Sequence, residues 1–411
     1  MKINLIRKLK WLYPGMGIKR WILFSVFGLF LVAIGSMKFQ ADIYLIVKAL
    51  DLVVILSGLT ILSLGIIKII RFFINVFLTP REREIFDIIY QRRLLERGPK
   101  VVTIGGGSGL SVLLEGLKEY TSNITAIVTV ADDGGSSGRL REQFDILPPG
   151  DIRNCLVALA DAPQLMRELF QFRFSSGSDL NGHSFGNLFI TVMTKLTGDF
   201  EKAIKESSKV LAIRGQVIPS TLTKVQLVAQ YKDGTITQGE AQIPKEHKPI
   251  QKVFLRPDNA TSIPDAIKAI KEASIIVLGP GSLYTSIIPN LLIKEITEAV
   301  VAADAIKVYV CNIMTQSGET DGYSASDHVK ALIEHSHPRL INYCLVNVGK
   351  VTQALLDRYH KDNSYPIVAD SRKIRSMGYR VIEDDIIDAG DYVRHNSDKL
   401  VRLLVGLTEE I

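Results

Sequence analysis

Cysteine is scarce in this 411-residue sequence. The three cysteines are Cys155, Cys311 and Cys344, and they lie far apart with no paired spacing. Such a pattern excludes a disulfide framework and offers no zinc-binding motif, and it fits a reducing compartment. We therefore expect three buried, structural thiols. Repeats and low-complexity tracts are also absent, and a composition of 47% apolar and 22% charged residues is that of an ordinary globular chain.

The larger, C-terminal part of the chain has no excess of basic residues. Residues 1–100 contain 16 Lys and Arg against 6 Asp and Glu, whereas the remaining 311 residues contain 33 against 37. A nucleic-acid-binding protein should show a basic stripe on its folded domain, and none is visible. We therefore expect no nucleic-acid partner. Basic residues that flank apolar segments indicate a membrane surface instead.

Long apolar runs occur only near the N-terminus. Two of them predict transmembrane helices at about 21–37 and 52–70, within a membrane anchor formed by residues 1–78. A signal peptide is the alternative for the first run, but no small-residue cleavage site follows Met37. A buried helical hairpin of a soluble protein is the alternative for both.

The distribution of Lys and Arg around these runs predicts their orientation. Six lie in residues 1–20 and eight lie between Lys68 and Lys100, while the connecting loop contains only Lys38 and Lys48. The positive-inside rule then predicts a two-pass protein of the inner (plasma) membrane, with both termini and the main domain in the cytoplasm.

Residues 79–99 mix charged and apolar side chains and predict an amphipathic connector helix that ends before Pro99. Beyond it, short apolar runs alternate with helical segments. This rhythm predicts a doubly wound, Rossmann-like α/β domain with a mainly parallel sheet over residues 100–411. We expect one long helix over 151–170. A β-rich insertion is expected over about 217–256, where Asp233-Gly234 marks a hairpin turn.

The first polar motif is a glycine loop between a predicted strand and a helix, Gly105-Gly106-Gly107-Ser108-Gly109. Backbone N–H groups without side chains can approach a phosphate at the positive end of a helix, so the loop predicts a phosphate site. Leu110 departs from the dinucleotide fingerprint and disfavours a nicotinamide-dependent oxidoreductase. The loop also lacks the Lys-Ser/Thr of a P-loop. A tight turn without a ligand is the alternative.

A second motif follows the next predicted strand, at the same edge of the sheet. Its candidate binding residues are Asp132, Asp133, Gly134, Gly135, Ser136 and Arg139. The paired carboxylates can hold Mg²⁺ or bind ribose hydroxyls, and Arg139 can bind phosphates with its guanidinium fork. The alternative is a solvated loop with an internal Asp–Arg pair.

Four further polar segments complete the candidate site. The segment Gly150–Asn154 offers Asn154 and also Asp151, which is equally well explained as a helix N-cap. The segment 181–187 offers Asn187 and His183, a general base or phosphate contact unless it is structural. A second glycine loop at 279–286 suggests a ligand with two anchoring points. Its candidate residues are Gly279, Gly281, Ser282 and Tyr284, and residues 312–320 add amides and hydroxyls at this edge.

Together these six motifs closely resemble those of the YvcK/CofD-like family, on its YvcK (gluconeogenesis factor) branch. The resemblance implies a Rossmann-like cytoplasmic domain that binds a nucleotide sugar such as UDP-N-acetylglucosamine. It also implies a regulator of cell shape and cell-wall synthesis during gluconeogenic growth. The CofD branch instead implies a Mg²⁺-dependent transferase, which moves a phospholactyl group from a guanylyl donor to a deazaflavin. Family members commonly lack membrane spans, so residues 1–78 are a departure.

Carried over from the resemblance, the diphosphate is expected on Gly106–Gly109 and the uridine and ribose at Asp132. Ser282 and Tyr284 are expected on the sugar or phosphate, with Arg139 and Asn187 completing the site. As a transferase, the chain would hold Mg²⁺ at Asp132 or Asp133, with His183 or Asn187 positioning the acceptor. No other cofactor is expected. The expected partners are the nucleotide sugar, the membrane, cell-wall synthesis proteins and a second copy of the chain.

Overall fold

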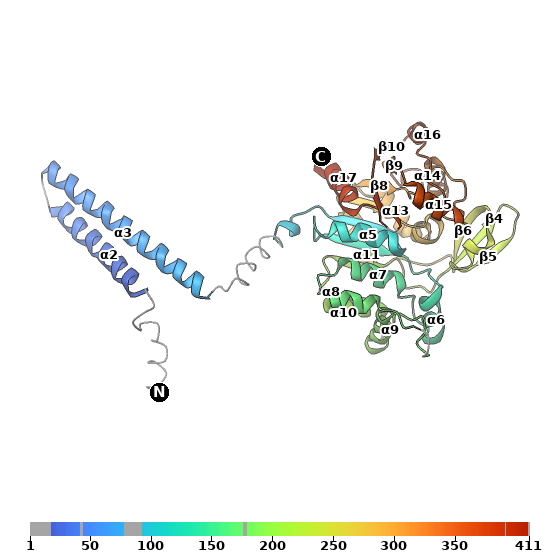
Figure 1. The fold of residues 1–411 in the computed structure, drawn as a ribbon, viewed down its shortest axis with the longest axis horizontal. Coiled ribbons are helices and arrows are strands. Elements are labelled where there is room, and N and C mark those ends of the chain that lie inside the picture. Colours follow the sequence, from blue (N-terminus) through green and yellow to red (C-terminus); the bar gives the residue numbers. More distant parts are fainter. Residues whose placement is uncertain (1–17, 42–43, 78–92, 176–178, 391, 410–411) are drawn as a thin grey trace. The chain divides into compact units, whose positions relative to one another are not determined.

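The structure is a computed structural model that describes residues 18–41, 44–77, 93–175, 179–390 and 392–409 (Figure 1). The chain divides into two compact units, residues 1–91 and 92–411. The amphipathic connector predicted for 79–99 lies mostly outside the described residues.

The N-terminal unit is a helical hairpin of α2 (Ile18–Ala41) and α3 (Leu45–Phe77). Both helices are long and apolar enough to cross a membrane. Glycine lets their backbones approach closely, since a Cβ on Gly28 would lie 2.6 Å from the Leu62 nitrogen and 2.8 Å from the Gly58 oxygen. Small residues at such contacts are typical of membrane helix pairs. The same features also suit a signal sequence or a soluble core hairpin.

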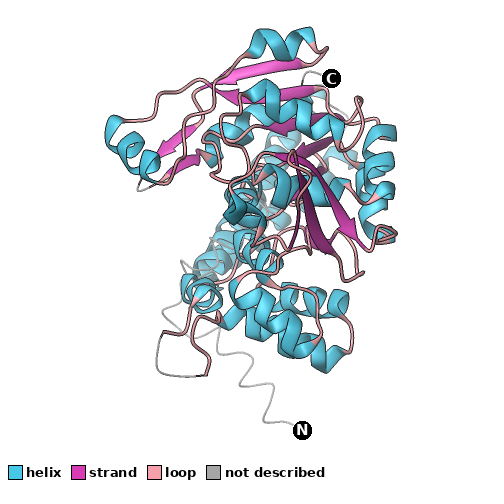
Figure 2. Ribbon diagram, turned by 90° about the vertical axis from the view of Figure 1, so that its right-hand side faces the viewer, coloured by secondary structure: helices cyan, strands magenta, loops and turns pink. Residues whose placement is uncertain are grey.

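The second unit is built on a seven-stranded sheet in which every neighbouring pair is parallel. Its central strands are almost wholly buried, because helices cover both faces (Figure 2). This confirms the doubly wound α/β fold. In sheet order the strands are β10 (Arg380–Asp384), β9 (Tyr343–Asn347), β8 (Ile306–Val310), β7 (Ile275–Leu278), β1 (Val101–Gly105), β2 (Ile124–Val128) and β3 (Gln216–Pro219).

The helices of this unit follow the strands in two groups. After β1 and β2 come α5 (Gly107–Leu117), α6 (Gly135–Phe144), α7 (Gly150–Leu159), α8 (Gln164–Gln171), α9 (Phe185–Thr197) and α10 (Phe200–Val210). The later ones are α11 (Pro264–Glu272), the π-helical turn η3 (Leu283–Ile287), α12 (Ile288–Leu291), α13 (Lys294–Ala302), α14 (Ala325–Glu334), α15 (Gln353–Lys361), α16 (Ser371–Ser376) and α17 (Ser397–Glu409).

Two predicted elements differ in extent from the structure. The long helix expected over 151–170 is wrong, because α7 ends at Leu159 and α8 begins only after Pro163. Proline lacks the N–H that a continuing helix needs and disfavours helix in the residue before it. The β-rich insertion is narrower than 217–256, because β3 belongs to the large sheet. A small antiparallel sheet contains β4 (Gln226–Tyr231), β5 (Ile236–Gln238) and β6 (Ile250–Arg256), with the 3₁₀ turn η2 (Ile243–Glu246) between the last two.

The C-terminal region adds a two-stranded sheet that the sequence pattern did not indicate. It pairs β11 (Ile387–Ala389) with β12 (Val393–His395) in antiparallel register. All three cysteines are buried and free, as expected.

Candidate functional site

The site lies where the chain reverses its direction across the large sheet. From β1 the chain proceeds to β2 and β3 on one side, whereas β7, β8, β9 and β10 follow one another on the other side. Right-handed crossovers then place the two groups of helices on opposite faces, which leaves a crevice beyond the carboxyl ends of β1 and β7. Both predicted glycine loops start at these two strand ends.

The first loop passes into α5 without a side-chain cap, because Gly106 is its N-cap residue. Gly107 has a φ of +68°, a conformation that favours glycine. At Gly106, a Cβ would lie 2.5 Å from a carboxylate oxygen of Asp151 and 2.7 Å from the methyl group of Thr129. The Gly107 amide donates a hydrogen bond to Asp151. The loop therefore packs directly against the first turn of α7.

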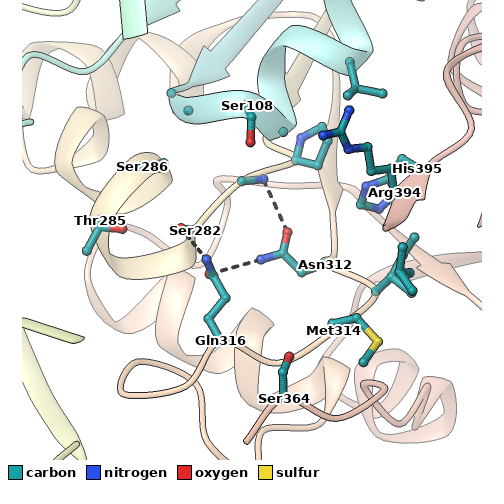
Figure 3. A pocket seen from close by; sticks show the side chains of 18 of the residues that line it. Ser108, Ser282, Thr285, Ser286, Asn312, Met314, Gln316, Ser364, Arg394 and His395 are labelled. Atoms are coloured by element: carbon teal, nitrogen blue, oxygen red, sulfur yellow. Dashed lines mark hydrogen bonds between the residues drawn. The ribbon is translucent and has the colours of Figure 1, made fainter. Parts of the chain in front are cut away.

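The second glycine loop contacts the first one. A Cβ on Gly109 would lie 2.9 Å from the Pro280 carbonyl oxygen, so only glycine allows this approach. The Gly281 amide donates to Asn312 Oδ1 over 3.3 Å, and Gln316 Nε2 donates to Ser282 Oγ over 2.5 Å (Figure 3). The loop continues into η3, and single π-helical turns are frequent at functional sites.

The two loops border a cavity of about 730 Å³ (Figure 3). Its walls come from loops at the carboxyl ends of β1, β2, β7 and β8, from the small sheet and from the C-terminal hairpin. Seven of the predicted site residues line it: Gly106, Gly107, Ser108, Gly109, Asp132 and, from the second loop, Gly281 and Ser282. Residues of the polar segment 312–320 also line it, namely Asn312, Ile313, Met314, Thr315, Gln316 and Ser317.

Three carboxyl groups of this cavity have raised pKa values. Burial raises the pKa of Asp151 to about 7, and the neighbouring Asp132 raises it further. Burial likewise raises the pKa of Glu240 to about 8, with Asp132 and Asp151 as the next causes. The pKa of Asp132 is raised by burial, which outweighs its hydrogen bonds from Gly134 and Ser137. Like charges thus converge on one wall and favour protonation or a bound cation.

The family resemblance implies a Mg²⁺ ion, and the residues at this wall fit such an ion only in part. Among the described residues, no group of three His, Cys, Asp or Glu lies close enough to hold a metal ion. Mg²⁺ is commonly held by one or two carboxylates together with phosphate oxygens of a ligand, and the electrostatic repulsion between Asp132 and Asp151 would be relieved by such an ion. Asp133 does not fit, because its Oδ1 accepts the Ala241 amide at 2.9 Å.

Several predicted site residues lie outside the cavity walls. Ser136, His183 and Asn187 form a separate buried cluster, and Arg139 donates to the Asn181 carbonyl at 2.8 Å. Tyr284 is buried, with its hydroxyl 2.8 Å from that of Tyr323. The others outside the lining are Gly105, Asp133, Gly134, Gly135, Asn154 and Gly279.

Sequence reasoning missed the part of the wall that comes from the C-terminal segments of the chain. Tyr359, Tyr392, Arg394 and His395 line it, and Arg394 is the one Lys or Arg among the described lining residues. His395 Nε2 lies 3.2 Å from the Cys311 carbonyl oxygen, and burial lowers the pKa of this imidazole to about 4. Glu240 was missed as well. The run Tyr392-Val393-Arg394-His395 combines aromatic and cationic side chains, but it follows no glycine-rich strand end and so gave no signal.

This fold and site place the chain among the doubly wound α/β proteins that carry a polar cavity at the switch point of the sheet. Residues 101–387 match the profile of the family described as 2-phospho-L-lactate transferase CofD. The chain belongs to this CofD family.

A protein from Bacillus subtilis named gluconeogenesis factor is 50% identical over 76% of this chain and 99% of its own length. A solved structure from Bacillus halodurans, described as a UPF0052 family member, superimposes with a TM-score of 0.73 at 46% identity, covering 75% of this chain and 99% of that one.

The relatives also differ in length. A protein from Nostoc sp. is 47% identical over 96% of this chain and 91% of its own length. That alignment is too long to leave out residues 1–91, whereas the Bacillus subtilis protein matches only 76% of this chain. The N-terminal unit is thus shared with some relatives and not with others.

Proposed function

We propose that the chain binds a nucleotide sugar of the UDP-N-acetylglucosamine type in this cavity and acts as a regulator. The observation that supports the proposal most directly is the contact between two glycine loops at the switch point of the sheet, both facing one cavity. Backbone amides at the start of α5 favour a phosphate, and the second loop offers another anchoring point. The family resemblance adds a role in cell shape and cell-wall synthesis during gluconeogenic growth.

The chemistry of the walls supports a diphosphate with polar groups on both sides. A cavity of about 730 Å³ has the size of a small-molecule site. Arg394 supplies a guanidinium group to the cavity, and Asn312, Gln316 and Ser282 supply donors and acceptors for hydroxyl groups (Figure 3). His183, the candidate general base, lies outside the walls, which favours a sensor over a hydrolytic enzyme.

Calorimetry on the full chain in detergent tests the proposal. UDP-N-acetylglucosamine should bind saturably, and Arg394→Gln should weaken binding by about tenfold or more, since one charge-assisted hydrogen bond contributes roughly 1.5–3 kcal/mol. Gly107→Asp should abolish it by placing a side chain and a negative charge at the loop. Arg372→Gln, an exposed arginine on α16, is the matched control and should bind normally. Absence of binding to the wild-type chain would refute the proposal.

A transferase remains the second candidate, because carboxyl groups of Asp132, Asp151 and Glu240 converge at the cavity. Bound Mg²⁺ would supply charge stabilisation for a transferred phosphoryl-type group. Incubation with a deazaflavin, a guanylyl-phospholactate donor and Mg²⁺ should then yield product with the wild-type chain and none with Asp132→Asn. No product with either chain would exclude this activity.

A further inference from the structure

Three of the predicted binding residues form a hydrogen-bonded cluster beside the cavity. Ser136 Oγ lies 3.0 Å from His183 Nδ1 and accepts a hydrogen bond from Asn187 Nδ2 over 3.2 Å. All three side chains are buried. The next residue, Ser137, instead hydrogen-bonds to Asp132 of the cavity. The first turn of α6 therefore separates the cluster from the cavity wall.

The hydrogen bonds of Ser136 determine the form of the imidazole. Ser136 accepts a hydrogen bond from Asn187, and among the described residues its buried hydroxyl hydrogen has no acceptor other than His183 Nδ1. A buried donor left unpaired costs free energy, so this hydrogen is directed at Nδ1. Nδ1 is then the acceptor, and the proton of a neutral His183 resides on Nε2. Burial lowers the pKa of His183, and the Arg139 and Arg173 guanidinium groups lower it further. At neutral pH the ring therefore presents an uncharged N–H donor.

Three arginines lie in this region: Arg139 and Arg173 act on the His183 ring, and Arg153 acts on Arg173. Arg139 donates to the Asn181 carbonyl over 2.8 Å, and Arg173 donates to the Gly182 carbonyl over 2.7 Å. Arg153 is only 8% exposed, and its buried Nε has no hydrogen-bond partner. Within the described part of the chain, none of the three forms an ion pair with Asp or Glu.

The backbone adds positive potential at the same place. The N-terminus of α6 lies between the two sites, because its N-cap residue Gly134 donates its amide to Asp132 of the cavity over 2.9 Å, whereas Ser136 in the first turn contacts His183. The positive end of the helix macrodipole therefore acts on both. Like charges gathered in this way repel one another, and a bound anion would relieve that repulsion.

We propose that Arg139, Arg173 and His183 form a second anion-binding site, which takes the phosphate group of a small molecule distinct from the nucleotide sugar. The planar guanidinium forks and the imidazole N–H match the three oxygens of a phosphate group. The inference goes beyond the proposed function, because it requires no nucleotide. It assigns a separate ligand to residues that sequence reasoning had placed in the main cavity.

Calorimetry with inorganic phosphate and with glucose 6-phosphate, on the full chain in detergent at constant ionic strength, tests the inference. Both probes should bind the wild-type chain. The double variant Arg139→Gln/Arg173→Gln should lose at least tenfold in affinity for both, whereas Arg139→Lys/Arg173→Lys should retain part of it. This comparison separates the effect of the positive charge on phosphate binding from the effect of the hydrogen bonds that the arginines donate to the Asn181 and Gly182 carbonyls.

Two further variants separate this site from the main cavity. Arg394→Gln should leave glucose 6-phosphate binding unchanged, and Arg372→Gln should do the same as an exposed control. Thermal unfolding of each variant shows that it is folded. Unchanged affinity in the folded Gln double variant, or complete loss of binding in Arg394→Gln, would overturn the inference. Binding of inorganic phosphate without glucose 6-phosphate would also overturn it, since the site would then hold only the free ion.

Discussion

At the scale of single residues, Gly106 shows why the first loop needs glycine although its own backbone is extended. Its φ of −176° is open to any residue, so conformation alone does not require glycine. The requirement comes from Asp151 and Thr129, whose atoms occupy the position that a Cβ would take. A tertiary contact between α7 and the loop therefore explains the sequence.

Gly106→Ala should destabilise the fold and abolish ligand binding. Overpacking of this kind costs about 1–3 kcal/mol, and the displaced loop would no longer present its amides. Thermal unfolding and calorimetry measure the two effects. Gly406→Ala is the matched control, because a Cβ there meets nothing within 4 Å in helix α17 and should stabilise by roughly 0.5–1 kcal/mol. Equal stability of Gly106→Ala and wild type would contradict the packing argument.

The raised pKa of Glu240 predicts that the unliganded chain loses stability as the pH rises. The folded state holds this proton up to a pKa of about 8, whereas the unfolded chain releases it near 4.5. The stabilisation from protonated Glu240 is complete below pH 4.5 and is lost as the pH rises through 8. Over this range the free energy of unfolding falls by at most about 1.4 kcal/mol per pH unit. Glu240→Gln should reduce this slope between pH 5 and 8 in urea unfolding. Glu246→Gln, at an exposed site nearby, should leave it unchanged, and an unaltered slope in Glu240→Gln would disprove the assignment.

At the scale of elements, the small sheet contributes Glu240 to a cavity that otherwise belongs to the large sheet. The link is Asp133, which follows β2 and accepts the Ala241 amide at 2.9 Å. Gly239, with a φ of +101°, lies against the same carboxylate, since a Cβ there would be 2.6 Å from Asp133 Oδ2. The second aspartate of the motif therefore joins two sheets and does not face the cavity.

Asp133→Ala should loosen this link without removing a cavity-lining side chain. The Ala241 amide would lose its partner, at a cost of about 1–3 kcal/mol. Hydrogen exchange over 236–246 should accelerate, and nucleotide-sugar affinity should fall about tenfold. Lys232→Ala changes an exposed side chain of the same small sheet and should have neither effect. Protected amides in Asp133→Ala would show that other contacts hold the sheet in place.

At the scale of the whole molecule, the two units suit different surroundings. Many large apolar side chains of α2 and α3 are exposed, whereas the second unit buries a continuous core. Exposed apolar surface of this extent is unfavourable in water and favourable in a bilayer. The solved relative from Bacillus halodurans is covered to 99% while it covers only 75% of this chain, so about a quarter of this chain has no counterpart in it.

We expect the full chain to remain in the membrane fraction after alkaline carbonate extraction, and residues 93–411 to be soluble. For the two-pass topology, Tyr44→Cys lies between the helices and should react with an impermeant maleimide in right-side-out vesicles. Lys350→Cys, in the second unit, should react only after permeabilisation, because this unit is expected in the cytoplasm. The native cysteines are buried and should not be labelled in either case. Extraction of the full chain by carbonate, or the reverse labelling pattern, would contradict the anchor or its orientation.

The sequence by itself determined the fold class, the family and the two glycine loops, because these depend on local patterns. Buried strands are continuous apolar runs, and a phosphate-type loop needs glycine between a strand and a helix. Parallel strands bring their carboxyl ends to one edge, so the approximate place of the site also followed from the order of the motifs.

Only the tertiary structure decided which polar residues share a cavity. Ser136 and Ser137 are neighbours in the chain, yet successive residues of a helix point in different directions, and one faces His183 while the other faces Asp132. Glu240 and Arg394 come from segments without a motif, and each reaches the cavity from one of the two small sheets. Such long-range contacts leave no periodic trace in the sequence.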